Sequence, residues 1–160
     1  MWTGTMLGVK SHNSTVGLSH GRFSVANGRL TSGEFTVNMK HIVPLDGNYS
    51  PDGSKQGTKA MFIGHLSSPD FFDVDNFSTA SFRISEAGSD WVKGQLTIRG
   101  KSHTETVTDL VKTERNGSTE LTGRLSFNRQ KYGVSWAAPM KDIVLSDNIE
   151  LNLHIVGAEQ

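Results

Sequence analysis

The chain has 160 residues, the length of one ordinary domain, and its 16 basic and 16 acidic residues cancel. This balance gives no overall field that would favour nucleic acid or an anionic membrane. The absence of cysteine excludes disulfides, thiolate nucleophiles and cysteine-ligated zinc. With 17 glycines and only four prolines, the composition favours curved strands and tight turns over a helical bundle.

Apolar and polar residues alternate along much of the chain, which predicts strands with one buried and one solvent-facing side. In chain order, the expected strands are residues 15–19, 21–26, 35–40, 80–85, 92–98, 104–111, 121–127 and 149–155. Asn-Gly at 27–28 and 116–117 and Ala-Gly at 87–88 predict tight turns between them. One long flexible loop is expected at 47–54, and we see no domain boundary in it.

Residues 58–73 interrupt the strand pattern with a helical one. Phe62 and Leu66 lie four residues apart, on one face of a helix. Ser68 and Pro69 then provide a capping residue and a first helical residue, with an acid behind them. We therefore expect two short turns of helix over one end of the sheet.

Eight alternating strands with hairpin-length links favour closure into a barrel, because closure removes exposed sheet edges. The predicted fold is all-β: a single antiparallel barrel domain, residues 1–160, of roughly eight strands with one short helical segment around residues 58–73. No stretch reaches the ~20 apolar residues of a membrane helix. The first residues lack a signal-peptide pattern, so we expect the cytoplasm for the chain as it stands and the periplasm if a leader was removed.

Four segments have a characteristic order and spacing: Gly-Glu-Phe at 33–35, GHLSSPDFFD at 64–73 followed by Ala-Ser-Phe at 80–82, VKGQLTIRG at 92–100, and RQKYG at 129–133. Together they resemble the motifs of the YceI-like, polyisoprenoid-binding family over nearly the whole chain. Residues 11–18 are more polar than in much of that family, and 47–57 replaces a short helix.

The resemblance implies a lipocalin-like barrel that carries or sequesters an isoprenoid, a quinone or a fatty-acid-like lipid, and it suggests a homodimer. The same apolar faces could instead fill a dry core, so the alternative is a closed barrel acting as a structural or stress-associated interaction module without ligand. The residues expected to contact a ligand are Phe35, Val37, Met39, Leu66, Phe71, Phe72, Phe82, Ile84, Leu96, Ile98, Leu125, Phe127, Leu151 and Leu153.

Polar residues within the matching segments allow two interpretations. His65 or Arg129 could contact a lipid headgroup at the mouth of the barrel. Alternatively, Asp70 is an acid at the start of a helix and Arg129 is its ion-pair partner, which would pin the helix to the barrel. We favour the second interpretation.

No catalytic, metal or cofactor site is expected. The serines lie outside any Gly-x-Ser-x-Gly pattern, no phosphate-binding loop is complete, and basic and aromatic residues do not cluster for nucleic acid. The six histidines are scattered without the spacing of a helical metal site. A small transmembrane β-barrel would need an apolar outer band with aromatic girdles. Glu150, Asn152 and His154 alternate with leucines, which argues against such a band. The sequence therefore favours a binding protein over an enzyme.

Overall fold

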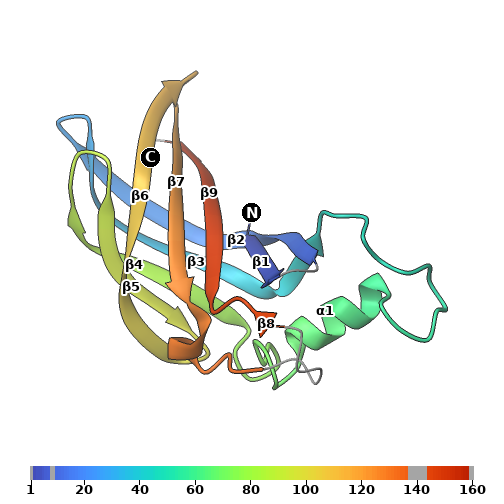
Figure 1. Ribbon diagram of the computed structural model, residues 1–160. Coiled ribbons are helices and arrows are strands. Elements are labelled where there is room, and N and C mark those ends of the chain that lie inside the picture. Colours follow the sequence, from blue (N-terminus) through green and yellow to red (C-terminus); the bar gives the residue numbers. More distant parts are fainter. Residues whose placement is uncertain (1, 8–9, 137–143, 159–160) are drawn as a thin grey trace.

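The computed structural model of the chain describes residues 2–7, 10–136 and 144–158 (Figure 1). The elements in chain order are β1 (Trp2–Leu7), β2 (Lys10–Ala26), β3 (Arg29–Pro44), α1 (Lys59–Ser67), β4 (Thr79–Ala87), β5 (Val92–Ile98), β6 (Lys101–Arg115), β7 (Ser118–Asn128), the 3-10 helix η1 (Arg129–Tyr132), β8 (Val144–Leu145) and β9 (Asn148–Ala158). In the described part of the chain, no helix has both the length and the apolar character needed to span a membrane.

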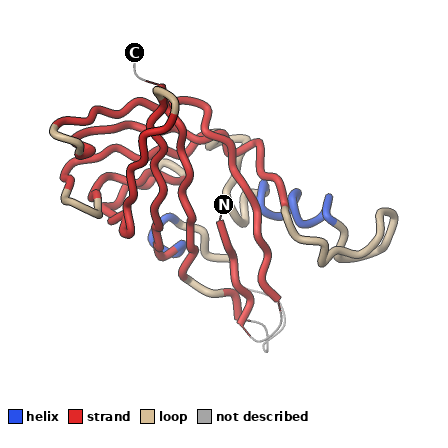
Figure 2. Tube along the Cα trace, turned by 90° about the horizontal axis from the view of Figure 1, so that it is seen from above, coloured by secondary structure: helices blue, strands red, loops and turns tan. Residues whose placement is uncertain are grey.

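The strands form one antiparallel sheet that curls into a nearly closed barrel. The order of neighbours is β2-β3-β4-β5-β6-β7-β9-β1-β8, and β1 also pairs with β2, which joins the two ends of the sheet. Figure 2 shows the strands on one side of the molecule, with α1 and the loop before it projecting from the other. The predicted all-β barrel with one short helix is confirmed.

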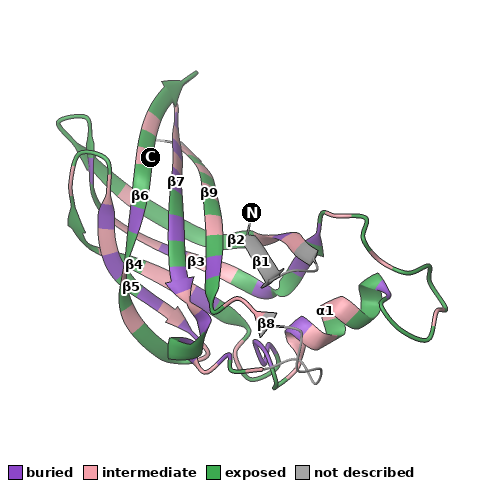
Figure 3. Cartoon of the chain, in the orientation of Figure 1, coloured by how far each residue is buried: buried purple, intermediate pink, exposed green. Residues whose placement is uncertain are grey.

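Alternating burial along the strands follows the alternating sequence. In β7, every second residue from Thr119 to Phe127 is buried, and this series includes Gly123 and Leu125 (Figure 3). A methyl group on Gly123 would come within 2.9 Å of Val107 on β6, so the glycine allows β6 and β7 to pack closely there. The inward faces of the strands build the core because their side chains point to one side of the sheet.

The predicted Asn-Gly turns form as the dipeptide requires. Asn27 and Gly28 have φ values of 52° and 75°, and Asn116 and Gly117 have 53° and 74°. Two successive residues with positive φ are characteristic of the turns that join tightly paired antiparallel strands. These turns connect β2 to β3 and β6 to β7.

The first strands differ from the prediction. The segments predicted as two strands, 15–19 and 21–26, belong to the single strand β2. The register against β3 shifts between Leu18 and His20, where Ser19 is an extra residue. Such a bulge breaks the period of two without ending the strand, which explains the split in the prediction. The short strands β1 and β8 were not predicted.

The helical segment is shorter than expected. Thr58 caps the start of α1 by accepting a hydrogen bond from the Met61 amide at 3.2 Å. Ser68 ends the helix with φ −68° and ψ 164°, rather than starting a second helical turn. A residue before proline is pushed away from helical dihedrals, and Pro69 follows Ser68. Hydrogen-bonded turns at 68–77 then lead back to the barrel.

Candidate functional site

The barrel encloses an apolar cavity of about 230 Å³. Of the fourteen residues that the sequence singles out for ligand contact, all except Leu66 and Phe71 line this cavity. Those two are buried in the core that includes the 68–77 turns. The alternation of the strands therefore brings together side chains from distant parts of the sequence around one space, and contact of these side chains with a ligand stays a prediction.

Further lining residues come from the same strand faces and were not predicted. Val92, Val107 and Leu121 continue the alternation of β5, β6 and β7 and are buried. Val16 and Leu18 come from β2, whose alternation is interrupted by the bulge, and the exposed fraction of Leu18 is 46%. The alternation could have identified the first three, whereas nothing in the sequence places Leu18 at an opening of the cavity.

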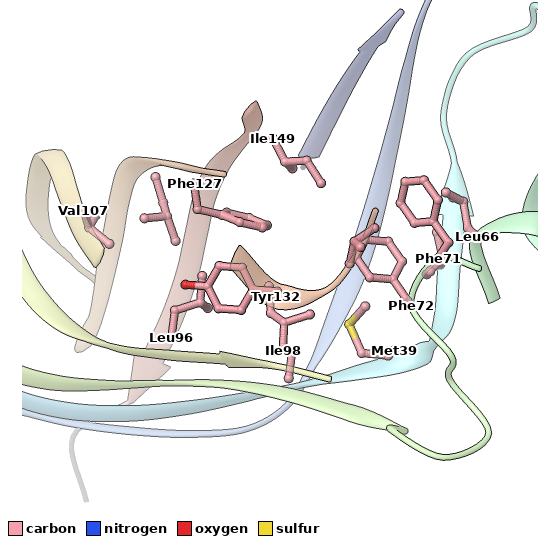
Figure 4. Close-up of a cluster of buried hydrophobic side chains, with 14 of the residues drawn as sticks. Met39, Leu66, Phe71, Phe72, Leu96, Ile98, Val107, Phe127, Tyr132 and Ile149 are labelled. Atoms are coloured by element: carbon pink, nitrogen blue, oxygen red, sulfur yellow. The ribbon is translucent and has the colours of Figure 1, made fainter. Parts of the chain in front are cut away.

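A cluster of aromatic and aliphatic side chains closes the barrel at the end near α1 and η1. Tyr132 of η1 is fully buried and packs edge-on against Phe127 at 5.3 Å between ring centroids. Phe72, Ile98 and Met39 lie beside it in Figure 4. The Tyr132 hydroxyl donates a hydrogen bond to Glu105 at 3.0 Å, so its polar end is satisfied. Packed side chains therefore close the cavity at this end of the barrel.

The chemistry of the cavity suits an uncharged chain. None of the described residues lining it is an aspartate, glutamate, lysine or arginine. Its polar lining groups belong to Ser81, Thr122, Asn152 and His154, and the His154 ring lies 2.7 Å from Glu120. Small-molecule sites usually have volumes of roughly 300–1,000 Å³, so this cavity suits one slim chain rather than a bulky ligand.

Arg129 does not line the cavity, and the prediction that it pairs with Asp70 is wrong. Its buried guanidinium donates to the backbone oxygens of Val134 at 2.6 Å and Trp136 at 3.1 Å. Ser146 and Leu145 accept further bonds through their backbone oxygens, and the carboxylate of Asp147 lies at 3.2 Å. Burial lowers the pKa of Arg129, and the charge of Asp147 opposes that shift. Arg129 thus joins the segment after η1 to β8 and to the turn between β8 and β9.

The anchoring role that the sequence analysis gave to Arg129 belongs to Arg99. Its Nη1 donates to the Phe71 carbonyl at 2.7 Å and to the Gly133 carbonyl at 2.8 Å. Its Nη2 lies 4.0 Å from the carboxylate of Asp73. Arg99 therefore pins the turn after α1 to the barrel, and the exposed Asp70 is not its partner.

His65 belongs to the last turn of α1 and does not line the barrel cavity. Its ring packs edge-on against Trp136 at 4.5 Å and Phe71 at 5.6 Å between centroids. Its Nε2 is buried and has no hydrogen-bond partner among the described residues. Burial lowers the pKa of His65, with the charge of Asp70 acting in the opposite direction. The neutral ring thus fits this apolar site better than the charged ring.

A groove beside α1 holds a second polar cluster, centred on Asp46. The carboxylate of Asp46 accepts bonds from the His12 ring at 3.2 Å, the Asn13 amide at 2.9 Å and the Tyr49 hydroxyl at 3.3 Å. Burial and the charge of Asp46 raise the pKa of Tyr49 to about 12. Tyr49 and His12 stack with their ring centroids 5.1 Å apart. This cluster fastens the 47–57 loop to β2.

The partly buried His65, whose Nε2 is shielded from solvent, predicts a pH-dependent stability. Between pH 7 and 5, His65 of the unfolded chain becomes protonated near its ordinary pKa of ~6.5. In the folded protein the lowered pKa keeps this ring neutral to a lower pH. The stabilisation contributed by the neutral His65 ring should therefore be fully present above pH ~6.5 and should decrease as the pH falls below that value. Urea unfolding at pH 7, 6 and 5 should show a steeper loss for the parent than for His65→Phe, which keeps an aromatic ring but cannot titrate. Parallel pH profiles for the two proteins would contradict this assignment.

An antiparallel barrel around an apolar cavity, closed at one end by packed side chains, defines the lipocalin-like class of barrels. The chain belongs to the family of YceI-like domains, whose family model matches residues 3–157.

Two staphylococcal proteins of related sequence are similar to parts of this chain. A UPF0312 protein of Staphylococcus epidermidis is 30% identical over 95 residues, which cover 54% of this chain and 55% of that protein. A UPF0312 protein of Staphylococcus aureus is 34% identical over 79 residues, which cover 45% of this chain and 46% of that protein. The chain thus spans about half the length of the curated relatives it matches.

Solved structures share the fold over nearly the whole chain. BcnA of Burkholderia cenocepacia matches with a TM-score of 0.69 at 18% identity, covering 98% of this chain and 95% of that one. A YCEI protein of Campylobacter jejuni matches with a TM-score of 0.67 at 14% identity, covering 96% and 88%. A polyisoprenoid-binding domain from Saccharophagus degradans, implicated in plant cell wall breakdown, matches with a TM-score of 0.62 at 7% identity, covering 97% and 89%. At these identities the likeness concerns the fold.

Proposed function

We propose that this protein binds a single-chain isoprenoid or a similar amphiphilic lipid inside the barrel, and carries or sequesters it rather than transforming it. The observation that carries the proposal is the 230 Å³ cavity, whose described lining contains no permanently charged side chain. The polyisoprenoid-binding domain with the same fold supports the ligand class.

The energetics favour such a ligand. Each methylene transferred from water into the cavity contributes ~0.8 kcal/mol, so a short prenyl tail provides several kcal/mol. Ordering the flexible chain opposes part of this gain. Because one methylene changes binding by only ~1–3 kcal/mol, the apolar wall discriminates poorly between tails of similar length. Selectivity must therefore come from cavity volume and from the headgroup.

A barrel with a closed core, serving as an interaction module, is the second candidate. It is favoured by the cavity volume, which lies below the ~300 Å³ at which most small-molecule sites begin. Side-chain rearrangement alone could fill so small a space. The two candidates differ in whether the purified protein carries lipid.

Organic extraction of purified protein followed by mass spectrometry should recover a lipid, and native mass spectrometry should report its mass together with the number of subunits. After delipidation, farnesol at a hundredfold over Kd should stabilise the protein by ~2.7 kcal/mol in unfolding experiments. Isopentenyl alcohol, which has the same hydroxyl on a five-carbon chain, should give no stabilisation at that concentration. Protein that yields no lipid and ignores farnesol would favour the closed-core module.

A further inference from the structure

The β6–β7 hairpin carries two charged side chains on its inner face, at the end of the barrel away from α1 (Figure 1). Lys112 of β6 lies directly opposite Leu121 of β7, and Glu114 lies directly opposite Thr119. Leu121 and Thr119 are buried, with exposed fractions of 3% and 4%. Residues directly opposite each other on neighbouring strands share one face of the sheet. Lys112 and Glu114 therefore lie on the same inner face as these buried residues.

A bulge in β6 turns these charges inward. The register against β7 shifts between Thr108 and Val111, and Asp109 within this stretch has a φ of 52°. After the shift, Val111 is 55% exposed, whereas the side chain of Lys112 is only 20% exposed. A regular strand would have continued the alternation from the buried Val107, with Val111 inside and Lys112 outside. Bulges often re-aim side chains beside functional sites, and this one places a charge where packing alone would place a valine.

The inward charges form a small arrangement that binds a carboxylate. The Lys112 ammonium donates a hydrogen bond to the carboxylate of Glu114. The Thr119 hydroxyl lies 3.0 Å from each oxygen of the same carboxylate and donates to it. The hydrogen bond from Lys112, followed by that from Thr119, lowers the pKa of Glu114. The protein thus holds one of its own carboxylates, in the charged form, on a lysine and a buried hydroxyl.

This arrangement adjoins the apolar cavity. Leu121, which lies opposite Lys112, lines the cavity, and so does Leu110, two residues before Lys112 on β6. Side chains that lie directly opposite each other have Cβ atoms about 4.5–5.5 Å apart. The stem of Lys112 therefore starts beside the cavity wall. A ligand whose tail passes Leu121 would bring its headgroup to the Lys112 ammonium.

Glu114 can leave these donors at little cost. Its side chain is 53% exposed, and it lies two residues before the turn at Asn116. An ion pair with an exposed carboxylate contributes little to stability, because solvent screens it. A ligand carboxylate offers Lys112 and Thr119 the same two acceptor oxygens and the same charge. A ligand hydroxyl brings no charge, so it would leave the Lys112 ammonium without a counter-ion if it displaced Glu114.

Resting on the proposed lipid-binding function, we infer that Lys112 and Thr119 bind the carboxylate headgroup of a fatty-acid-like or prenyl carboxylic acid, which displaces Glu114 while its tail fills the cavity. The ligand class is thus a long-chain carboxylate rather than a long-chain alcohol. Glu114 is the internal competitor that occupies the two donors when no ligand is bound.

Titration calorimetry at pH 8 with farnesoic acid and farnesol, which share one tail, tests the inference. Farnesoic acid is ionised at this pH, and the delipidated parent should bind it at least about tenfold more tightly than farnesol. Lys112→Met keeps the apolar stem but removes the cation. It should weaken farnesoic acid binding about tenfold and so remove the preference for the acid. Glu114→Gln removes the competing charge and should strengthen farnesoic acid binding about threefold.

Lys93→Met is the matched control. Lys93 also pairs with a glutamate, Glu86 at 3.3 Å, but it does not line the cavity. Its removal should leave both affinities within about twofold of the parent, the small effect of a remote surface charge. Thermal unfolding should show that all three variants are folded.

Three outcomes would overturn the inference. If Lys112→Met keeps the preference for the acid, as Lys93→Met does, Lys112 is not the headgroup site. If Glu114→Gln weakens farnesoic acid binding, Glu114 is not a competitor of the ligand. A parent that prefers farnesol contradicts the carboxylate class. In all three cases, binding of either compound inside the barrel would still support the proposed function, whereas a parent that binds neither compound removes the inference and the proposed function together.

Discussion

Arg129→Met is expected to lower the free energy of unfolding by at least about 3 kcal/mol. Arg129 is 3% exposed, and its guanidinium donates to backbone oxygens of Val134, Trp136, Leu145 and Ser146. Methionine keeps the apolar stem but donates nothing, so these acceptors lose their donor. Each buried acceptor left unsatisfied costs ~1–3 kcal/mol. Urea unfolding followed by circular dichroism would measure the change.

Two variants control this experiment. Asp147→Asn removes the carboxylate partner of Arg129, but Asp147 is 53% exposed, so the loss should stay below about 1 kcal/mol. Arg124→Ala removes an exposed arginine 3.8 Å from Asp109 and should have almost no effect. If Arg129→Met is as stable as the parent but no longer binds farnesol, this result would contradict the structural role of Arg129 and would support its contact with the lipid headgroup.

The strand pattern could be predicted because it is local. Period-two alternation predicted β5 at 92–98 with the observed bounds, and the Asn-Gly dipeptides predicted the turns after β2 and β6. β1 could not be predicted in this way, because six residues form a strand there only through pairing with β2 and β9. The expected number of roughly eight strands is one below the nine of the described residues, because β2 was counted twice while β1 and β8 were missed.

Side-chain partners were harder to predict than strands. The cavity wall follows from alternation, since a barrel interior receives every second residue of each strand. The partners of Arg129 lie in the irregular segment 133–136, at the end of the two-residue strand β8 and in the turn after it, where no period relates residue number to position. Arg99, and not Arg129, anchors the 68–73 turn, because Gly133 after η1 lies close enough to Phe71 for one Arg99 nitrogen to donate to both carbonyl oxygens.

Leu125→Trp is expected to weaken farnesol binding about a hundredfold while the protein remains folded. Leu125 is 4% exposed, lines the cavity, and lies opposite Val107 on β6 and Leu151 on β9. An indole directed into the cavity should displace about four carbons of a bound tail, which is ~3 kcal/mol at ~0.8 kcal/mol per methylene. Farnesol affinity should therefore fall by about a hundredfold. Calorimetry would measure the affinity, and unfolding with and without farnesol would measure the lost stabilisation.

Arg124→Ala serves as the neighbouring control on the outer face of the same strand. Arg124 is exposed and does not line the cavity, so its removal should change neither farnesol affinity nor stability. In a core without usable space, the larger indole would instead force side chains and backbone apart, at a cost of ~1–3 kcal/mol or more. Unfolding of Leu125→Trp would therefore support the closed-core module. Binding of farnesol by Leu125→Trp at the parent's affinity would place the tail elsewhere, because Leu125 lines the space that the tail must fill.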